Sequence, residues 1–313
     1  MACLSPTARS PPSRRPYASS PPARQASSRA SPAAPGASPA SITPATVSKP
    51  PTGASPRAWS AGAEAMAETA AAGEAGAIYL SPHLDDAALS CGGQIVARSR
   101  RGERPWIVTA CTAAAPAELS PFARRLHRQW GLDGADVADV RRREDRAACA
   151  VLGAEPHHLD LLDGAYRRVD GDWLYPTWRA LCGPPSPRDP ALARLVELLA
   201  RLPPAARVVA PLAAGGHVDH RLMRRAAEEV FGRRLTYYED LPYARSRIVL
   251  LRALGWRRWR WRRQTIPLSA ADLDAKCRAI ACYASQFPDP HPIEHQIRTL
   301  AHHRGGERTW QRR

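Results

Sequence analysis

Apolar positions along the chain alternate between two spacings from residue 77 onward. Short continuous apolar runs, typical of buried strands, cover residues 78–81, 106–112, 158–163, 207–212 and 235–239. Between and after them, apolar residues recur on one helical face in residues 87–98, 139–152, 191–202, 222–231 and 273–284. Strands that alternate with helices are typical of a mostly parallel sheet covered by helices on both faces. We therefore predict a single α/β domain.

The first 73 residues lack this pattern. They are dominated by Pro, Ser and Ala with scattered Arg, and they contain almost no large apolar residues. Such a segment buries too little apolar surface to offset its ordering entropy, so we expect it to be disordered. Met66 lies just before the first predicted strand and is an alternative start of the protein. The expected division is a tail over 1–73, a domain over 74–290 and a C-terminal extension over 291–313.

A formal net charge of +16 raises the question of an anionic partner. The charge is densest in residues 255–263, which read Gly-Trp-Arg-Arg-Trp-Arg-Trp-Arg-Arg. Arg and Trp together can stack on bases, or contact a membrane surface or an acidic glycan. No nucleic-acid-binding signature accompanies the segment, so no specific nucleic acid is expected. An exposed arginine-rich edge is the simpler interpretation, and peripheral contact with an anionic surface is the alternative.

The cysteines and the hydropathy of the chain indicate the cellular compartment in which the protein is expected. Seven cysteines are scattered along the chain without a C-x-x-C motif. This pattern favours reduced thiols over a disulfide framework or a cysteine-type zinc site. The chain also lacks a run of about 18 apolar residues, the length that a membrane-spanning helix needs. We therefore expect a cytoplasmic protein without a transmembrane segment.

Polar clusters follow two of the predicted strands. Residues 83–86 read His-Leu-Asp-Asp, and residues 217–220 read His-Val-Asp-His. The carboxyl ends of parallel strands are where ligands bind in open α/β sheets. Two histidines and one carboxylate, with positions left for water, suit a catalytic Zn²⁺, and Fe²⁺ accepts the same set. A second carboxylate beside them can take a proton from water, as hydrolysis requires. In the alternative interpretation the aspartates only cap the helices that follow.

The two clusters resemble the motifs of the PIG-L/LmbE family of zinc-dependent N-deacetylases. The first family motif is commonly written A-H-P-D-D-E and the second H-x-D-H, where this chain has Pro-His-Leu-Asp-Asp-Ala and His-Val-Asp-His. Leu84 and Ala87 depart from the first motif. The similarity also extends over residues 141–145, 161–166 and 276–286. The resemblance implies an LmbE-like, Rossmann-like fold and hydrolysis of an amide.

The resemblance also implies roles for individual residues. The residues that would hold the zinc are His83, Asp86 and His220. Asp85 would be the general base that activates the zinc-bound water for attack on the amide. His217 would stabilise the oxyanion or protonate the leaving amine, with Asp219 orienting its ring. Substrate contacts near the sugar are implied for Arg141, Glu144 and Asp163. Because Arg141 and Glu144 are three apart on one predicted helix, an ordinary surface ion pair is the alternative for those two.

The function implied by the resemblance is zinc-dependent removal of an acetyl or related acyl group from the 2-amino position of a glucosamine-containing small molecule. An amidase that acts on thiol conjugates uses the same residues and is an alternative within the same reaction class. An alternative from another class is a non-catalytic protein that binds a polyanion or a membrane surface through residues 255–263.

Overall fold

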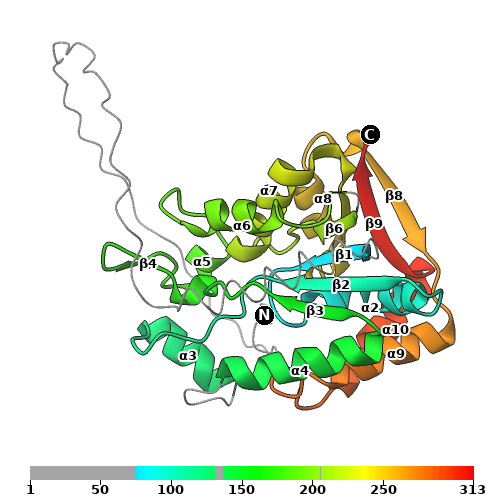
Figure 1. Cartoon of the computed structure of the whole chain (residues 1–313), viewed down its shortest axis with the longest axis horizontal. Helices are drawn as coiled ribbons and strands as arrows, with labels where there is room; N and C mark the ends of the chain where they lie inside the picture. The colour runs from blue at the N-terminus through cyan, green and yellow to red at the C-terminus, as the bar shows by residue number, and fades with distance from the viewer. Residues whose placement is uncertain (1–74, 131–136, 205) are drawn as a thin grey trace, which may run out of the picture. The chain divides into compact units, whose positions relative to one another are not determined.

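The computed structural model describes residues 75–130, 137–204 and 206–313, which are built around one large sheet (Figure 1). Its seven strands follow the order β3-β2-β1-β6-β7-β9-β8. Their bounds are β1 Ala75–Ser81, β2 Arg104–Thr109, β3 Glu155–His158, β6 Arg207–Pro211, β7 Thr236–Tyr238, β8 Trp261–Ile266 and β9 Glu307–Arg312. The strands from β3 to β7 in this order pair in parallel, whereas β9 is antiparallel to both β7 and β8. The predicted mostly parallel sheet is confirmed.

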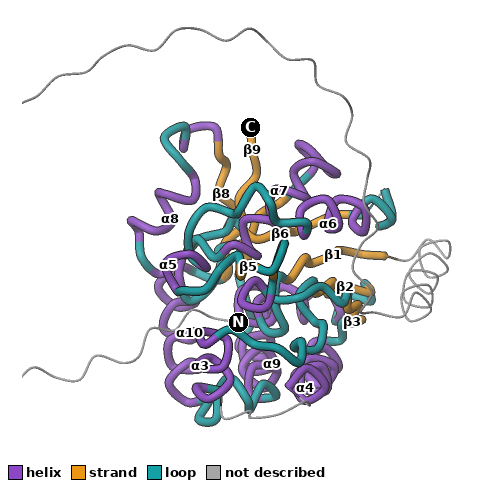
Figure 2. Tube along the Cα trace, turned by 90° about the vertical axis from the view of Figure 1, so that its left-hand side faces the viewer, coloured by secondary structure: helices purple, strands orange, loops and turns teal. Residues whose placement is uncertain are grey.

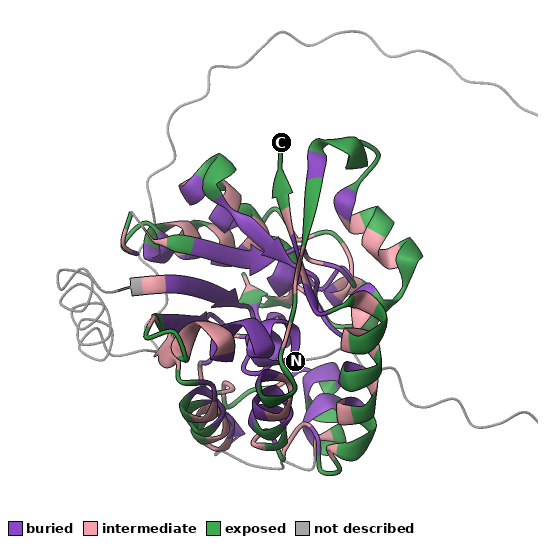
Figure 3. Ribbon diagram, turned by 90° about the vertical axis from the view of Figure 1, so that its right-hand side faces the viewer, coloured by how far each residue is buried: buried purple, intermediate pink, exposed green. Residues whose placement is uncertain are grey.

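Helices cover both faces of this sheet (Figure 1). One face packs against α2 Asp86–Ser99, α4 Val137–Leu152, α9 Ala270–Ala281 and α10 His291–Arg304. The other face packs against α6 Ala191–Leu199, α7 Val218–Phe231 and α8 Arg247–Leu254. Alternation along β1 explains this division, because Ile78 and Leu80 join the second core and Tyr79 joins the first. Figure 3 shows the central strands coloured mostly as buried.

A smaller layer lies over the start of α7. It contains α3 Pro121–Gln129, α5 Trp178–Leu181 and a hairpin of β4 Arg168–Val169 and β5 Asp172–Trp173. Phe122 and Leu126 of α3 share one apolar cluster with Leu181 of α5 and Val218 of α7. The segment 116–134, whose apolar pattern is amphipathic but broken, thus places one short helix beside the carboxyl edge of the sheet. Residues 131–136 lie outside the described residues.

One predicted strand needs correction, and two strands were missed. The run 158–163 was expected to be a strand, but β3 ends at His158. Asp160 has a φ of 57°, in the left-handed region, and its backbone N–H donates to Thr112 Oγ1 at 2.9 Å. Regular strand pairing therefore stops at His158, although Leu159 and Leu161 still donate to the carbonyl oxygens of Thr109 and Ala110. The sequence pattern also missed β8 and β9, because most of their side chains are polar and give no apolar signal.

Residues 291–313, expected as an extension, contribute α10 and β9, and β9 lies within the sheet between β7 and β8. A buried ion pair ties β9 to the first core, since Lys276 Nζ of α9 lies 2.7 Å from Glu307 Oε1. Glu307 also accepts the backbone N–H groups of Gly93 and Gln94 in α2. The sheet domain therefore runs to the end of the described residues. The predicted tail over 1–73 and the alternative start at Met66 lie outside them.

The helices were also compared with what a membrane-spanning helix requires. Among the described residues, no helix combines the length and the apolar content that crossing a bilayer requires.

Candidate metal centre and active site

The two predicted clusters lie together because β1 and β6 are neighbouring parallel strands. The chain leaves β1 through residues 82–85 into α2, and leaves β6 through residues 212–217 into α7. Gly215 and Gly216 in the second loop have φ values of +87° and +79°, which L side chains rarely adopt. A Cβ at Gly215 would also lie 2.5 Å from the ring of Tyr243. These two loops bring the side chains of both motifs to one buried point at the carboxyl edge of the sheet.

Asp85 has an unusual backbone conformation at the start of α2. Its φ is 134°, a strained value for a non-glycine residue that costs about 1–3 kcal/mol. Although Asp85 occupies the N-cap position, its side chain makes no capping hydrogen bond. At α7 the N-cap is His217, whose Nδ1 accepts from the backbone N–H of Asp219. Helix capping therefore does not explain why these carboxylates are here.

The side chains of His83 and His220 both contact Asp86. Its Oδ2 lies 3.2 Å from His83 Nδ1 and 3.2 Å from His220 Nε2, and it also accepts the backbone N–H of His83 at 2.9 Å. All three residues are almost completely buried. Within the described residues, His220 Nε2 makes no well-aligned hydrogen bond, and its ion-pair partner is Asp86. The two inner ring nitrogens and the carboxylate thus converge, as metal ligands do.

The outer nitrogens of both rings face carboxylates. His83 Nε2 lies 2.9 Å from Asp219 Oδ2, and His220 Nδ1 lies 2.7 Å from Asp240 Oδ1. A histidine that binds a metal commonly donates its other N–H to a carboxylate, which fixes the tautomer and orients the ring. When both rings are neutral and carry their proton on the outer nitrogen, the lone pairs of His83 Nδ1 and His220 Nε2 point inward. The residues present therefore fit a divalent metal bound by two imidazoles and Asp86.

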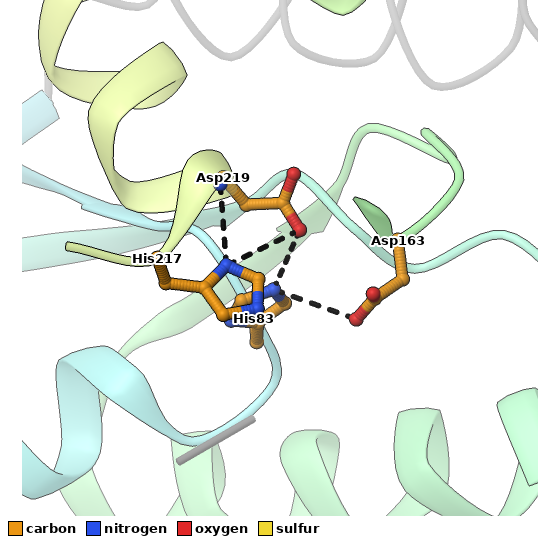
Figure 4. A group of neighbouring side chains, drawn as sticks. All are labelled: His83, Asp163, His217 and Asp219. Carbon is orange, nitrogen blue, oxygen red and sulfur yellow. Dashed lines mark hydrogen bonds and ion pairs between the residues drawn. The ribbon is translucent and has the colours of Figure 1, made fainter. Parts of the chain in front are cut away.

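A second group of possible ligands shares His83 and contains Asp163, His217 and Asp219 (Figure 4). Asp163 Oδ2 lies 3.5 Å from His83 Nε2, and His217 Nδ1 lies 3.7 Å from Asp219 Oδ2. This group is less suited to a metal because its acceptors are already used. Asp219 accepts from Arg167 and from the backbone N–H of Gly164, and His217 Nδ1 accepts from backbone.

Neighbouring charges shift the pKa values of the residues around Asp86. Burial lowers the pKa of His220, but Asp86 and Asp240 outweigh it and raise the pKa to about 10. Burial raises the pKa of Asp86, but His220 outweighs it and holds that pKa well below its ordinary value. For His217, burial and the neighbouring His83 both act to lower the pKa well below its ordinary value. His217 is therefore a neutral ring, and because Nδ1 accepts a hydrogen bond, the proton is assigned to Nε2.

Known proteins of one kind are similar to this chain in sequence and in fold. A model of the family described as PIG-L, GlcNAc-PI de-N-acetylase, matches residues 78–231. The 2'-N-acetylparomamine deacetylase of Streptomyces fradiae is 34% identical over 245 residues, covering 74% of this chain and 80% of that protein. The chain belongs to the PIG-L family of N-deacetylases. It is accordingly a hydrolase that acts on an amide bond.

Two further relatives of this PIG-L protein agree. The 2'-N-acetylparomamine deacetylase of Niallia circulans is 27% identical over 229 residues, covering 67% of this chain and 82% of that protein. A solved structure of the zinc inhibited form of teicoplanin deacetylase Orf2 superposes with a TM-score of 0.61 at 28% identity. That comparison covers 74% of this chain and 96% of the solved chain. The fold of the family is therefore shared over nearly the whole length of that deacetylase.

Of the three predicted substrate residues of this PIG-L protein, two line a cavity at the site and one makes a structural contact. Arg141 is buried, donates to the carbonyl oxygen of Leu84 at 2.8 Å and lies 4.0 Å from Asp85 Oδ1. Arg141 and Asp163 both line a small cavity, and Asp163 lies beside the candidate ligand His83. Glu144 instead accepts the backbone N–H of Ser285 at 2.7 Å and the Ser285 hydroxyl, so it anchors the turn after α9. The surface ion pair between Arg141 and Glu144 is absent from the described residues.

Two functional candidates were missed by the sequence analysis. Asp240 lies two residues after the end of β7, so a carboxylate near the end of a third parallel strand was the available signal. Arg167 is buried, pairs with Asp219 and lies 3.1 Å from Asp189 Oδ2. It sits in an irregular segment without a recognisable motif, so no sequence pattern pointed to it. Asp219 was expected to orient His217, but its nearest imidazole nitrogen belongs to His83.

Proposed function

We propose that this protein removes the N-acetyl group from a glucosamine-containing small molecule, using a divalent metal held by His83, Asp86 and His220. The observation that carries the proposal is the pair of histidines whose outer nitrogens face Asp219 and Asp240 while their inner nitrogens meet at Asp86. The Streptomyces fradiae relative, by its name, acts on 2'-N-acetylparomamine. An N-acetylated amino sugar of that kind is the first substrate to test.

We assign the metal as Zn²⁺, since two imidazoles and one carboxylate with open positions suit it, and Fe²⁺ is the alternative. When bound, the metal supplies Lewis acidity, which polarises the amide carbonyl and makes water a better nucleophile at neutral pH. Asp219 and Arg167 hold the ring of His83, and Asp240 holds the ring of His220. The ligands are thus in place before the metal arrives.

Proton transfer falls to Asp85. It adjoins the ligand Asp86, and its strained backbone turns it away from a capping role. Asp85 accepts the proton of the attacking water and returns it to the amine nitrogen as the C–N bond breaks, giving acetate and the free amino sugar. Arg141 Nη2 lies 4.0 Å from Asp85 Oδ1 and is the charged group that helps to orient this carboxylate.

The neutral ring of His217 stabilises the oxyanion that forms on the substrate carbonyl oxygen. Its Nε2–H is free to donate to the carbonyl oxygen as negative charge develops there, because Nδ1 is held by the backbone of α7. Asp163, in the cavity beside the ligands, is positioned to accept from a sugar hydroxyl.

The test begins with protein stripped of metal by a chelator. It is assayed for free amine with 2'-N-acetylparomamine and a panel of N-acetylglucosaminides, before and after addition of Zn²⁺, Fe²⁺ or Co²⁺. Zinc is varied from one equivalent upward, since a relative is known in a zinc inhibited form. We expect turnover that depends on one metal equivalent and is absent from His220→Ala. Metal-independent turnover, or turnover that His220→Ala retains, would contradict the proposal.

A further inference from the structure

An exposed apolar surface lies on α8 and the turn after it, far from the metal ligands in sequence. Its four side chains are Ile248, Leu251, Trp256 and Trp259, which are 63%, 46%, 72% and 60% exposed. The two indole rings contact each other edge to face, with centroids 5.6 Å apart. We call these four residues the α8 face. Figure 2 shows α8 at the outer edge of the molecule.

The α8 face is not simply the buried side of an amphipathic helix. Leu254 of α8 is buried in the core, and Leu250 packs against that core. Ile248 and Leu251 therefore point to the opposite side, where a surface helix ordinarily carries polar residues. A helix with apolar residues on both sides has a second surface that something else can cover.

Positive charge surrounds the α8 face. Residues 241–271 contain eight arginines and no aspartate or glutamate, and the arginines are 245, 247, 252, 257, 258, 260, 262 and 263. Each of the eight is exposed, and none forms an ion pair with a carboxylate of the described residues. Arg257 stacks 4.5 Å from the ring centroid of Trp256, which joins the charged and apolar parts into one surface. The complementary partner is therefore anionic.

The chemistry of the apolar side chains selects among anionic partners. A nucleic acid would use the two tryptophans for stacking but has little use for exposed Ile and Leu. The boundary between lipid headgroups and acyl chains accepts all four side chains, and Trp is enriched there. Arginine can keep its guanidinium at the lipid phosphates while its stem lies along the apolar part.

We propose that the α8 face docks on an anionic membrane surface, with its four apolar side chains at the headgroup boundary and the arginines on lipid phosphates. This attachment is peripheral and needs neither the metal nor the proposed substrate. It would hold the protein at a bilayer while the metal centre, built from other loops, works on its own substrate.

Vesicle flotation with the full-length protein tests the proposal. The vesicles are phosphatidylcholine alone or phosphatidylcholine mixed with phosphatidylglycerol, at low and high salt. We expect binding only to the anionic vesicles, weakened by salt. Trp256→Ser/Trp259→Ser should weaken that binding by about tenfold or more, because burial of exposed indole is lost. Arg257→Ser/Arg258→Ser should weaken it by about 30-fold, from about 1 kcal/mol for each arginine near the surface.

A matched control separates this face from net charge. Arg143→Ser/Arg146→Ser removes two exposed arginines of α4 and should leave binding unchanged, although the total charge falls equally. Because residues 1–74 also contain arginines, all variants keep the full chain. The proposal is overturned if both arginine pairs weaken binding alike, or if the wild type ignores anionic vesicles. It is likewise overturned if the α8 face instead holds a single-stranded oligonucleotide or a second copy of the chain, with no vesicle binding.

Discussion

Replacing Asp240 by asparagine should weaken metal binding without touching a metal ligand. Asp240 is buried, with Oδ1 2.7 Å from His220 Nδ1 and Oδ2 accepting the backbone N–H of Ala214 at 3.0 Å. Asparagine keeps the shape but removes the negative charge that makes the imidazole a stronger ligand. Loss of such a partner typically costs 10- to 100-fold in metal affinity, which is about 1.4–2.7 kcal/mol. We expect a loss in this range for Asp240→Asn.

The assay is a competition titration of metal-free protein against a chromophoric chelator at neutral pH. Asp145→Asn is the matched control, because Asp145 is also buried and its Oδ2 lies 2.8 Å from His158 Nε2. It also accepts from the hydroxyl of Tyr283, away from the ligands. The control should lose stability but keep the wild-type metal affinity. Equal affinity of Asp240→Asn and the wild type would refute the role given to Asp240.

The remaining predictions concern the titration of His220, a loop glycine and a buried ion pair. Metal affinity should rise by about one log unit per pH unit below pH 10, because the proton on His220 must leave before metal binds; titration with Co²⁺ across neutral pH measures this slope, and a flat profile contradicts it. Because the folded state raises the pKa of His220, the protonated ring also stabilises the metal-free fold. This contribution is complete below pH 6.5 and is lost as the pH rises through about 10, and urea unfolding at a series of pH values measures it. Gly215→Ala should destabilise the fold by about 1–3 kcal/mol, because its φ is +87° and the new Cβ would clash with Tyr243; an unchanged urea midpoint argues against that strain. Glu307→Ala should cost about 3–5 kcal/mol by leaving Lys276 buried without its carboxylate, and Glu307→Ala/Lys276→Met should recover much of it in the same assay.

The three candidate metal ligands could be predicted to lie together because they follow the ends of two predicted strands. The sequence placed His83, Asp86 and His220 at the ends of two apolar runs, and neighbouring parallel strands end at the same edge. The neighbours that hold these ligands were harder to find. Asp240 follows a strand of only three residues and has no histidine beside it, and the segment around Arg167 carries no periodic pattern. Side-chain partners of this kind depend on tertiary packing, which spacing along the chain does not encode.

Predictions of the fold failed where the apolar signal was weak. The edge strand β8 carries arginines on its exposed positions, and β9 is mostly polar, so neither matched a buried-strand pattern. The predicted strand over 158–163 failed for a different reason, since the left-handed conformation of Asp160 turns the backbone after β3. Buried central strands were predicted well because both of their faces are covered by helices.

Comparison of the wild type with Asp85→Asn, for metal content and for release of free amine, tests the central claim most directly. Both proteins are purified in parallel, loaded with one equivalent of Zn²⁺ and assayed on 2'-N-acetylparomamine and the N-acetylglucosaminide panel. We predict one bound metal in each protein and a loss of turnover in Asp85→Asn of about 10²–10⁴-fold, the usual contribution of a general base. Absence of bound metal from the wild type, or wild-type turnover by Asp85→Asn, would contradict the account.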